Sequence, residues 1–212
     1  MEQVMKERKG AFNQGIRVVS VVLHPLLMPV FGILILFYSG TYLSFLPETA
    51  KRMITLIVTG GMFIIPLSLL PFYIYRKMIS SVELTQRNER FVPLLVTAIL
   101  YYFTFTLLKN LGVSHLILSM LLSALISIVI LMIIGRKYNI SLHAAGMAGL
   151  SGFLLALSLR YGLSSPVILY GSFILTGLVG SVRLKQGAHR PPEIYTGYLV
   201  GFVCSLAIGI LF

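Results

Sequence analysis

Long apolar segments alternate with short polar segments along the whole chain. Seven segments approach the roughly 20 apolar residues that a helix needs to cross a bilayer. They cover residues 18–40, 53–75, 91–109, 112–135, 143–160, 164–182 and 194–212. Because backbone groups in lipid must form hydrogen bonds within their own segment, these segments are expected to be helices. The pattern predicts an all-α, polytopic transmembrane helical bundle with about six to seven membrane helices.

No polar linker, tandem repeat or low-complexity segment divides the chain. We therefore expect one integral membrane domain, residues 1–212, in which residues 1–17 form a short basic N-terminal tail. The first apolar segment is too long for a signal peptide and is expected to stay as a helix. Small residues crowd the fifth and sixth segments, which predicts close helix packing there. Four prolines in the first two segments predict kinks: Pro25, Pro29, Pro66 and Pro71.

The composition agrees with a membrane protein, because 57% of the residues are hydrophobic and only 11% are charged. The chain has 17 Lys and Arg residues against six Glu and no Asp, which gives a net charge of +11. These basic residues lie in short loops and not in a stripe with aromatic side chains. The expected partners are therefore anionic membrane lipids, and no nucleic acid. The single cysteine, Cys204, cannot form an internal disulfide.

If all seven segments cross, the N-terminus and the loops at 76–90, 136–142 and 183–193 share one side. That side carries 13 Lys and Arg residues, and the other side carries four. The positive-inside rule therefore predicts that the first side is cytoplasmic. Segments 91–109 and 112–135 leave two possibilities open, since they either cross fully or form a re-entrant pair.

Polar residues that can carry chemistry gather in the three loops of this side. Together the loops offer several guanidinium groups, two histidines, a hydroxyl and a carboxylate. Arginine matches phosphate oxygens bidentately, and histidine is suited to nucleophilic attack and proton transfer near neutral pH. Pro191 and Pro192 predict that the last helix starts there, with His189 just outside it. Glu193 would then lie in the first turn, close enough to accept a hydrogen bond from the imidazole.

The third loop resembles the last signature of the type 2 phosphatidic acid phosphatase superfamily, which also includes the vanadium haloperoxidases. That signature reads Ser-Arg, five residues, His, three residues, Asp. Arg183, His189 and Glu193 stand at these spacings, with Val182 at the serine position and glutamate replacing aspartate. The chain is thus similar to a divergent member of this superfamily.

The other two signatures of the superfamily are matched in part. Ser141 and His143 occupy the serine and histidine of Pro-Ser-Gly-His. Arg90 occupies the arginine of the first signature, which reads Lys, six residues, Arg-Pro. Glu83 stands at its lysine position, and Arg87 is an alternative cation, so the choice between Arg87 and Arg90 stays open. The three matches span about half of the chain.

The resemblance implies a metal-independent lipid phosphate phosphatase that uses no cofactor. Its substrate would be a lipid phosphate or a polyprenyl pyrophosphate, and its location would be the bacterial cytoplasmic (inner) membrane. His189 would attack phosphorus and become a phosphohistidine, Glu193 would orient it, and His143 would protonate the leaving oxygen. Four residues would hold the phosphate oxygens: Arg87, Arg90, Ser141 and Arg183.

Two other classes of function remain as alternatives. One is a catalytically inactive membrane protein of the same fold that binds anionic lipid, which the altered first signature favours. The other is a small transporter or a haem-binding protein, the latter with His24 and His115 as ligands, although no motif supports either. The side of the membrane also stays open, because bacterial members of the superfamily commonly work on the outer face.

Overall fold

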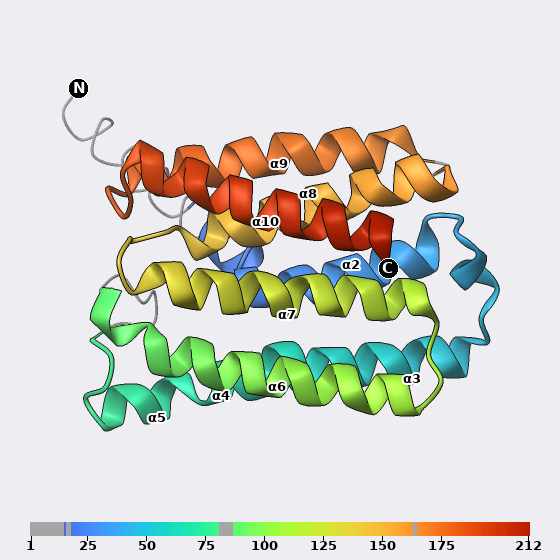
Figure 1. Cartoon of the computed structure of the whole chain (residues 1–212), viewed down its shortest axis with the longest axis horizontal. Helices are drawn as coiled ribbons and strands as arrows, with labels where there is room; N and C mark the ends of the chain where they lie inside the picture. The colour runs from blue at the N-terminus through green and yellow to red at the C-terminus, as the bar shows by residue number, and fades with distance from the viewer. Residues whose placement is uncertain (1–14, 16–17, 81–86, 163–164) are drawn as a thin grey trace.

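The computed structural model describes Gly15 and residues 18–80, 87–162 and 165–212; most of the predicted basic tail, 1–17, lies outside them. In this part of the chain the long helices run side by side along one axis (Figure 1). Among the described residues, six helical segments are long and apolar enough to cross a membrane, so the protein is a multi-pass integral membrane protein. They are α3–α5 (Glu48–Tyr75), α6 (Phe91–Asn110), α7 (His115–Gly135), α8 (Leu142–Tyr161), α9 (Pro166–Lys185) and α10 (Pro191–Leu211).

The first apolar segment was predicted to form one spanning helix, and this prediction is wrong. His24 is extended (φ −67°, ψ 136°) and separates a helical turn at residues 18–22 from the rest of the segment. A 3₁₀ turn, η1 (Pro25–Leu27), and α2 (Met28–Tyr38) follow it. A residue before proline avoids the helical region, so the segment breaks at His24. Another 3₁₀ turn, η2 (Tyr42–Phe45), leads to α3.

The second apolar segment spans, but its helix is irregular around its two prolines. It runs through α3 (Glu48–Thr59), a π-helical turn η3 (Gly60–Ile64), α4 (Ile65–Ser68) and α5 (Leu70–Tyr75). Proline lacks an N–H group, and its ring clashes with the carbonyl four residues earlier. The wider π turn lies directly before Pro66 and leaves room for that ring.

Segments 91–109 and 112–135 form full-length helices. α6 has 20 residues and α7 has 21, enough for each to cross the hydrocarbon core. They meet at the end of the bundle that also holds the C-terminus (Figure 1). A re-entrant pair is therefore not what these segments form.

The three polar loops lie together at the opposite end of the bundle, at the left of Figure 1. One connects α5 to α6 and contains the turn η4 (Arg87–Glu89), whereas the others connect α7 to α8 and α9 to α10. The prediction that these loops face one another is confirmed. Glu83, at the lysine position of the first signature, falls outside the described residues.

A stripe of small residues joins α10 to α8. Gly197, Gly201, Ser205 and Gly209 recur every fourth residue and are buried. A Cβ on Gly201 would collide with the backbone carbonyl of Ala145, so the two backbones approach closely. Close packing is thus confirmed for the fifth segment. In the sixth segment it is confirmed at Gly180, where an added Cβ would collide with the ring of Tyr198 on α10. It is not found at Gly171 and Gly177, where an added Cβ would meet nothing within 4 Å.

Gly201→Ala is expected to destabilise the protein, because the new methyl group would push α10 away from α8. Overpacking of this kind costs about 1–3 kcal/mol. Thermal unfolding of the detergent-purified protein measures the effect. Gly171→Ala is the matched control, since the same change there meets open space. Equal melting temperatures for the two variants would contradict the close contact between α8 and α10.

Candidate functional site

A cavity begins at the end of the bundle where the three loops meet and continues between the helices. Its volume is about 140 Å³. Within the described part of the chain, five basic side chains line its outer end, and its deeper walls are mostly apolar, reaching Tyr101 and Phe153. His143 and Phe153 stand ten residues apart on α8, which places the deep end about 15 Å below the outer end. The basic residues are His24, Arg90, His143, Arg183 and His189.

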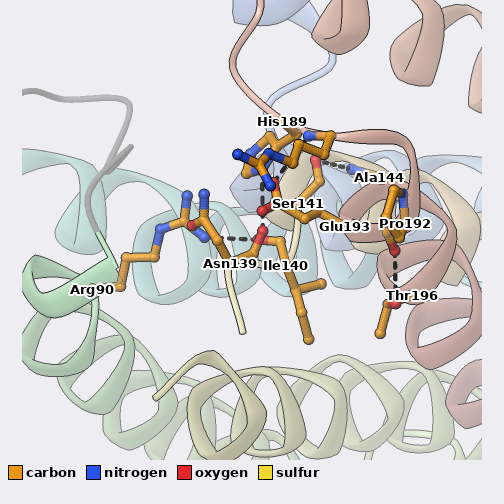
Figure 2. Close-up of polar contacts among 10 residues, drawn as sticks. Arg90, Asn139, Ile140, Ser141, Ala144, His189, Pro192, Glu193 and Thr196 are labelled. Atoms are coloured by element: carbon orange, nitrogen blue, oxygen red, sulfur yellow. Dashed lines mark hydrogen bonds and ion pairs between the residues drawn. The ribbon is translucent and has the colours of Figure 1, made fainter. Parts of the chain in front are cut away.

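His189 lies in the loop before α10 and is only 7% exposed. Its Nδ1 is 3.1 Å from a carboxylate oxygen of Glu193 and 3.2 Å from the backbone oxygen of Asn139 (Figure 2). Both of these oxygens accept hydrogen bonds, so Nδ1 must carry a hydrogen and donate it. In the neutral ring the other nitrogen, Nε2, therefore holds the lone pair. That tautomer is the one that a nucleophilic or proton-accepting Nε2 requires.

Glu193 is held in place by the start of α10. The same oxygen that accepts from His189 also accepts from the backbone N–H of Arg190, at 3.0 Å. The backbone oxygen of Glu193 accepts a hydrogen bond from the N–H of Ser141 at 3.2 Å. Two loops far apart in sequence are thus joined at this residue. The predicted hydrogen bond between Glu193 and the imidazole is confirmed.

The surroundings of His189 favour, on balance, the neutral form of its imidazole ring. Burial lowers its pKa below the ordinary value, and the charges of Arg90 and Arg183 lower it further. The hydrogen bond to Glu193 acts in the opposite direction and raises the pKa, but the net direction is downward. At neutral pH the ring is therefore mostly unprotonated, so the lone pair on Nε2 is available.

Arg183 brings a guanidinium into the cavity wall from the last turn of α9. Its side chain is among the largest that are fully buried, with 1% exposed. Nη1 donates to the side-chain oxygen of Gln186 at 3.0 Å, and Gln186 in turn donates to the hydroxyl of Ser20 at 3.1 Å. This chain of contacts fixes the guanidinium from the side of the first helical turn.

Arg87 and Arg90 both bind the loop between α7 and α8, but they differ in exposure. Arg90 is 4% exposed, lines the cavity and donates to the backbone oxygen of Ile140 at 2.7 Å (Figure 2). Burial lowers its pKa to about 10, so it stays charged at neutral pH. Arg87 is exposed, donates to the backbone oxygen of Lys137 at 3.0 Å and does not line the cavity. The geometry favours Arg90 as the cation that faces a bound anion.

The two residues of the middle signature have different surroundings. His143 lines the cavity, and its Nε2 is 3.3 Å from the backbone oxygen of Ser20. Ser141 is completely buried and does not line the cavity. Its hydroxyl accepts from the backbone N–H of Ala144 at 3.4 Å, so it caps the start of α8. The expectation that Ser141 holds phosphate gains no support from this position.

His24 is a cavity residue that the sequence patterns did not place in the site. Its ring lies edge-on to that of His143, with centroids 5.3 Å apart. His115 lies at the opposite end of the bundle, 5.9 Å from the ring of Phe212. The two histidines therefore cannot ligate one haem iron. One sequence feature could have identified His24 as a site residue: it directly precedes Pro25. That proline ends the first helical turn at the end of the bundle where the polar loops lie.

Among the described residues no group of three or more His, Cys, Asp or Glu side chains is arranged to hold a metal ion. No protein-family model, curated protein or solved structure matches this chain. The functional argument therefore depends on the geometry of the cavity.

Proposed function

We propose that this protein is a membrane phosphatase that hydrolyses a lipid phosphate or an isoprenoid pyrophosphate through a phosphohistidine intermediate. The observation that carries the proposal is the state of His189, a neutral buried imidazole whose Nδ1–H is held by Glu193. Two buried arginines, Arg90 and Arg183, share its cavity. The apolar depth of the cavity suits a lipid tail, and the basic outer end suits a phosphate. The bacterial cytoplasmic membrane is the proposed location.

The proposed reaction has two steps. In the first, the lone pair of His189 Nε2 attacks phosphorus, the bond from phosphorus to the lipid oxygen breaks, and protonated His143 gives that oxygen its proton. In the second, His143 takes a proton from water, the resulting hydroxide attacks phosphorus, and the phosphorus–nitrogen bond breaks. Arg90 and Arg183 balance the charge on the phosphoryl oxygens in both steps.

The contacts of the two histidines agree with these roles. Glu193 stabilises the positive charge that His189 gains when its Nε2 is phosphorylated, since Nδ1 keeps its hydrogen. The backbone oxygen of Ser20 accepts from His143 Nε2 and so fixes the orientation of that ring in the cavity. His189 can therefore act as the nucleophile in the first step and as the leaving group in the second. His143 can act as the general acid in the first step and as the general base in the second.

Phosphate release by the detergent-purified protein tests the proposal directly. The substrates are phosphatidic acid, phosphatidylglycerol phosphate, undecaprenyl pyrophosphate and a lipid A phosphate, each with EDTA present. We expect release from at least one of them in EDTA. Release only after a divalent metal is added would contradict a metal-independent histidine mechanism.

The alternative of an inactive lipid-binding protein is favoured by one observation. Arg87 is exposed and directed to a backbone oxygen, so the cavity contains one cation fewer than the resemblance implies. Binding of the same lipids without phosphate release from any of them would support this alternative and overturn the enzyme.

The pH dependence of turnover should reveal the neutral state of His189. Because its pKa is lowered, the ring is unprotonated at neutral pH, and kcat/KM should fall only as pH drops below the ordinary histidine range. Glu193→Gln removes a group that raises this pKa, so the acidic limb should move to still lower pH. We also expect kcat to fall about tenfold or more, since the imidazolium loses its carboxylate. An acidic limb that moves upward would contradict the assignment.

A further inference from the structure

His24 is part of the cavity wall but has no role in the proposed reaction. It stands in the extended bend between the first helical turn and η1. Its ring shares the cavity with Arg183 and His189 and lies edge-on to His143. A third histidine beside two arginines in a largely apolar cavity needs an explanation, because burying polar groups is unfavourable unless they are hydrogen-bonded.

One nitrogen of the His24 ring already has a partner. The backbone N–H of Leu26 donates to Nδ1 at 3.3 Å. Nδ1 must therefore hold a lone pair, and in the neutral ring the hydrogen resides on Nε2. The following Pro25 restricts the backbone of His24, which limits how far the ring can move. The remaining polar group of this side chain is thus an N–H donor in a fixed position.

The segment that carries His24 is linked by hydrogen bonds to two residues of the proposed reaction, Arg183 and His143. Ser20, one turn earlier, accepts from Gln186 through its hydroxyl and from His143 through its backbone oxygen. Gln186 binds Arg183. The segment that carries His24 is therefore attached both to a phosphate-binding arginine and to the histidine that acts as acid and base.

We propose that His24 is a third phosphate-binding group, whose Nε2–H donates a hydrogen bond to a phosphate oxygen of the substrate. This assignment rests on the proposed phosphate ligand but not on turnover. A neutral N–H donor suits this position because Arg183 and Arg90 already supply positive charge. It also keeps its hydrogen at neutral pH without needing protonation.

Two substitutions separate this role from the structural role of the ring. The Oδ1 of asparagine can accept from Leu26 as Nδ1 does, but asparagine is too short to reproduce Nε2. The amide nitrogen of glutamine can replace Nε2–H, but glutamine does not reproduce the Nδ1 acceptor. His24→Asn should therefore keep the cap and lose the phosphate donor, whereas His24→Gln should do the reverse.

Binding of hexadecylphosphonate, which cannot be hydrolysed, is measured by calorimetry on the detergent-purified variants. We expect His24→Asn to weaken binding about tenfold, the effect of losing one hydrogen bond to a charged group. His24→Gln should bind nearly as the wild type does but melt at a lower temperature. If His24→Asn proves unstable, His24→Gln is compared with His24→Met, since both lack the cap and only glutamine donates.

The outcomes are distinct from those of the phosphatase assay. Wild-type affinity in His24→Asn, or no difference between glutamine and methionine, would overturn the assignment of His24. So would failure of the wild type to bind the phosphonate. If the wild type binds the phosphonate but releases phosphate from no lipid, the proposed hydrolysis fails while the variants still decide the role of His24.

Discussion

Replacing His189 with alanine is expected to reduce phosphate release by at least about 10⁴-fold, because the nucleophile is lost. His189→Asn is the sharper variant. The amide nitrogen of asparagine can still donate to Glu193 and to the backbone oxygen of Asn139, but nothing replaces Nε2. Both variants should fold, since the residue lies in a loop outside α10. Initial rates with the best lipid substrate and melting temperatures measure the two effects.

A histidine at the other end of the bundle provides the control. His115 is exposed and begins α7, so His115→Ala should keep wild-type activity. A substrate labelled in its phosphate adds a second measurement, because wild-type enzyme should acquire an acid-labile label and His189→Asn should not. Turnover by His189→Asn at the wild-type rate would show that another group attacks phosphorus.

Arg183→Ala should have the next largest effect, a loss of about 10²–10³-fold in kcat/KM. Removing one preorganised donor to the reacting group has this magnitude in other enzymes. Arg183 is buried in the cavity wall, so no solvent charge can substitute for it. Arg183→Lys keeps the positive charge but loses the planar fork, and we expect it to restore only part of the rate. Steady-state kinetics should show kcat falling together with binding.

Lys185→Ala is the matched control for Arg183, because Lys185 is exposed in the same last turn of α9. It should lower kcat/KM by less than about twofold, as expected for an exposed charge on the protein surface. Equal losses in the two variants would mean that the net charge of this end, and not the guanidinium in the cavity, controls activity.

Most of the fold could be predicted because lipid allows few structures for an apolar segment. Length and hydrophobicity identified six spanning helices, with ends shifted by a few residues, as for the helix that begins at Glu48. The break at His24 was harder to predict. A proline in a membrane helix produces either a mild kink or a complete break, and packing against neighbouring helices decides which. Pro66 gave a π turn, whereas Pro25 ended the helix.

The site was predictable where residues are close in sequence. The contact between His189 and Glu193 follows from a helix start at Pro191 and their four-residue spacing. Arg87 and Arg90 could not be ranked, since three residues in an irregular loop do not determine which side chain turns inward. His24 was missed because its partners, Leu26 excepted, come from distant parts of the chain, His143 among them.

Because of the small-residue stripe of α10, substitutions far from the proposed phosphate-binding groups should also reduce activity. His143 is carried by α8 and His189 by the loop into α10, so their separation depends on how closely those two helices approach. Gly209, near the far end of α10, would place an added methyl group 2.6 Å from the side chain of Ala156. A random mutagenesis screen for lost activity should therefore recover glycines across the whole thickness of the membrane, including positions that no substrate reaches.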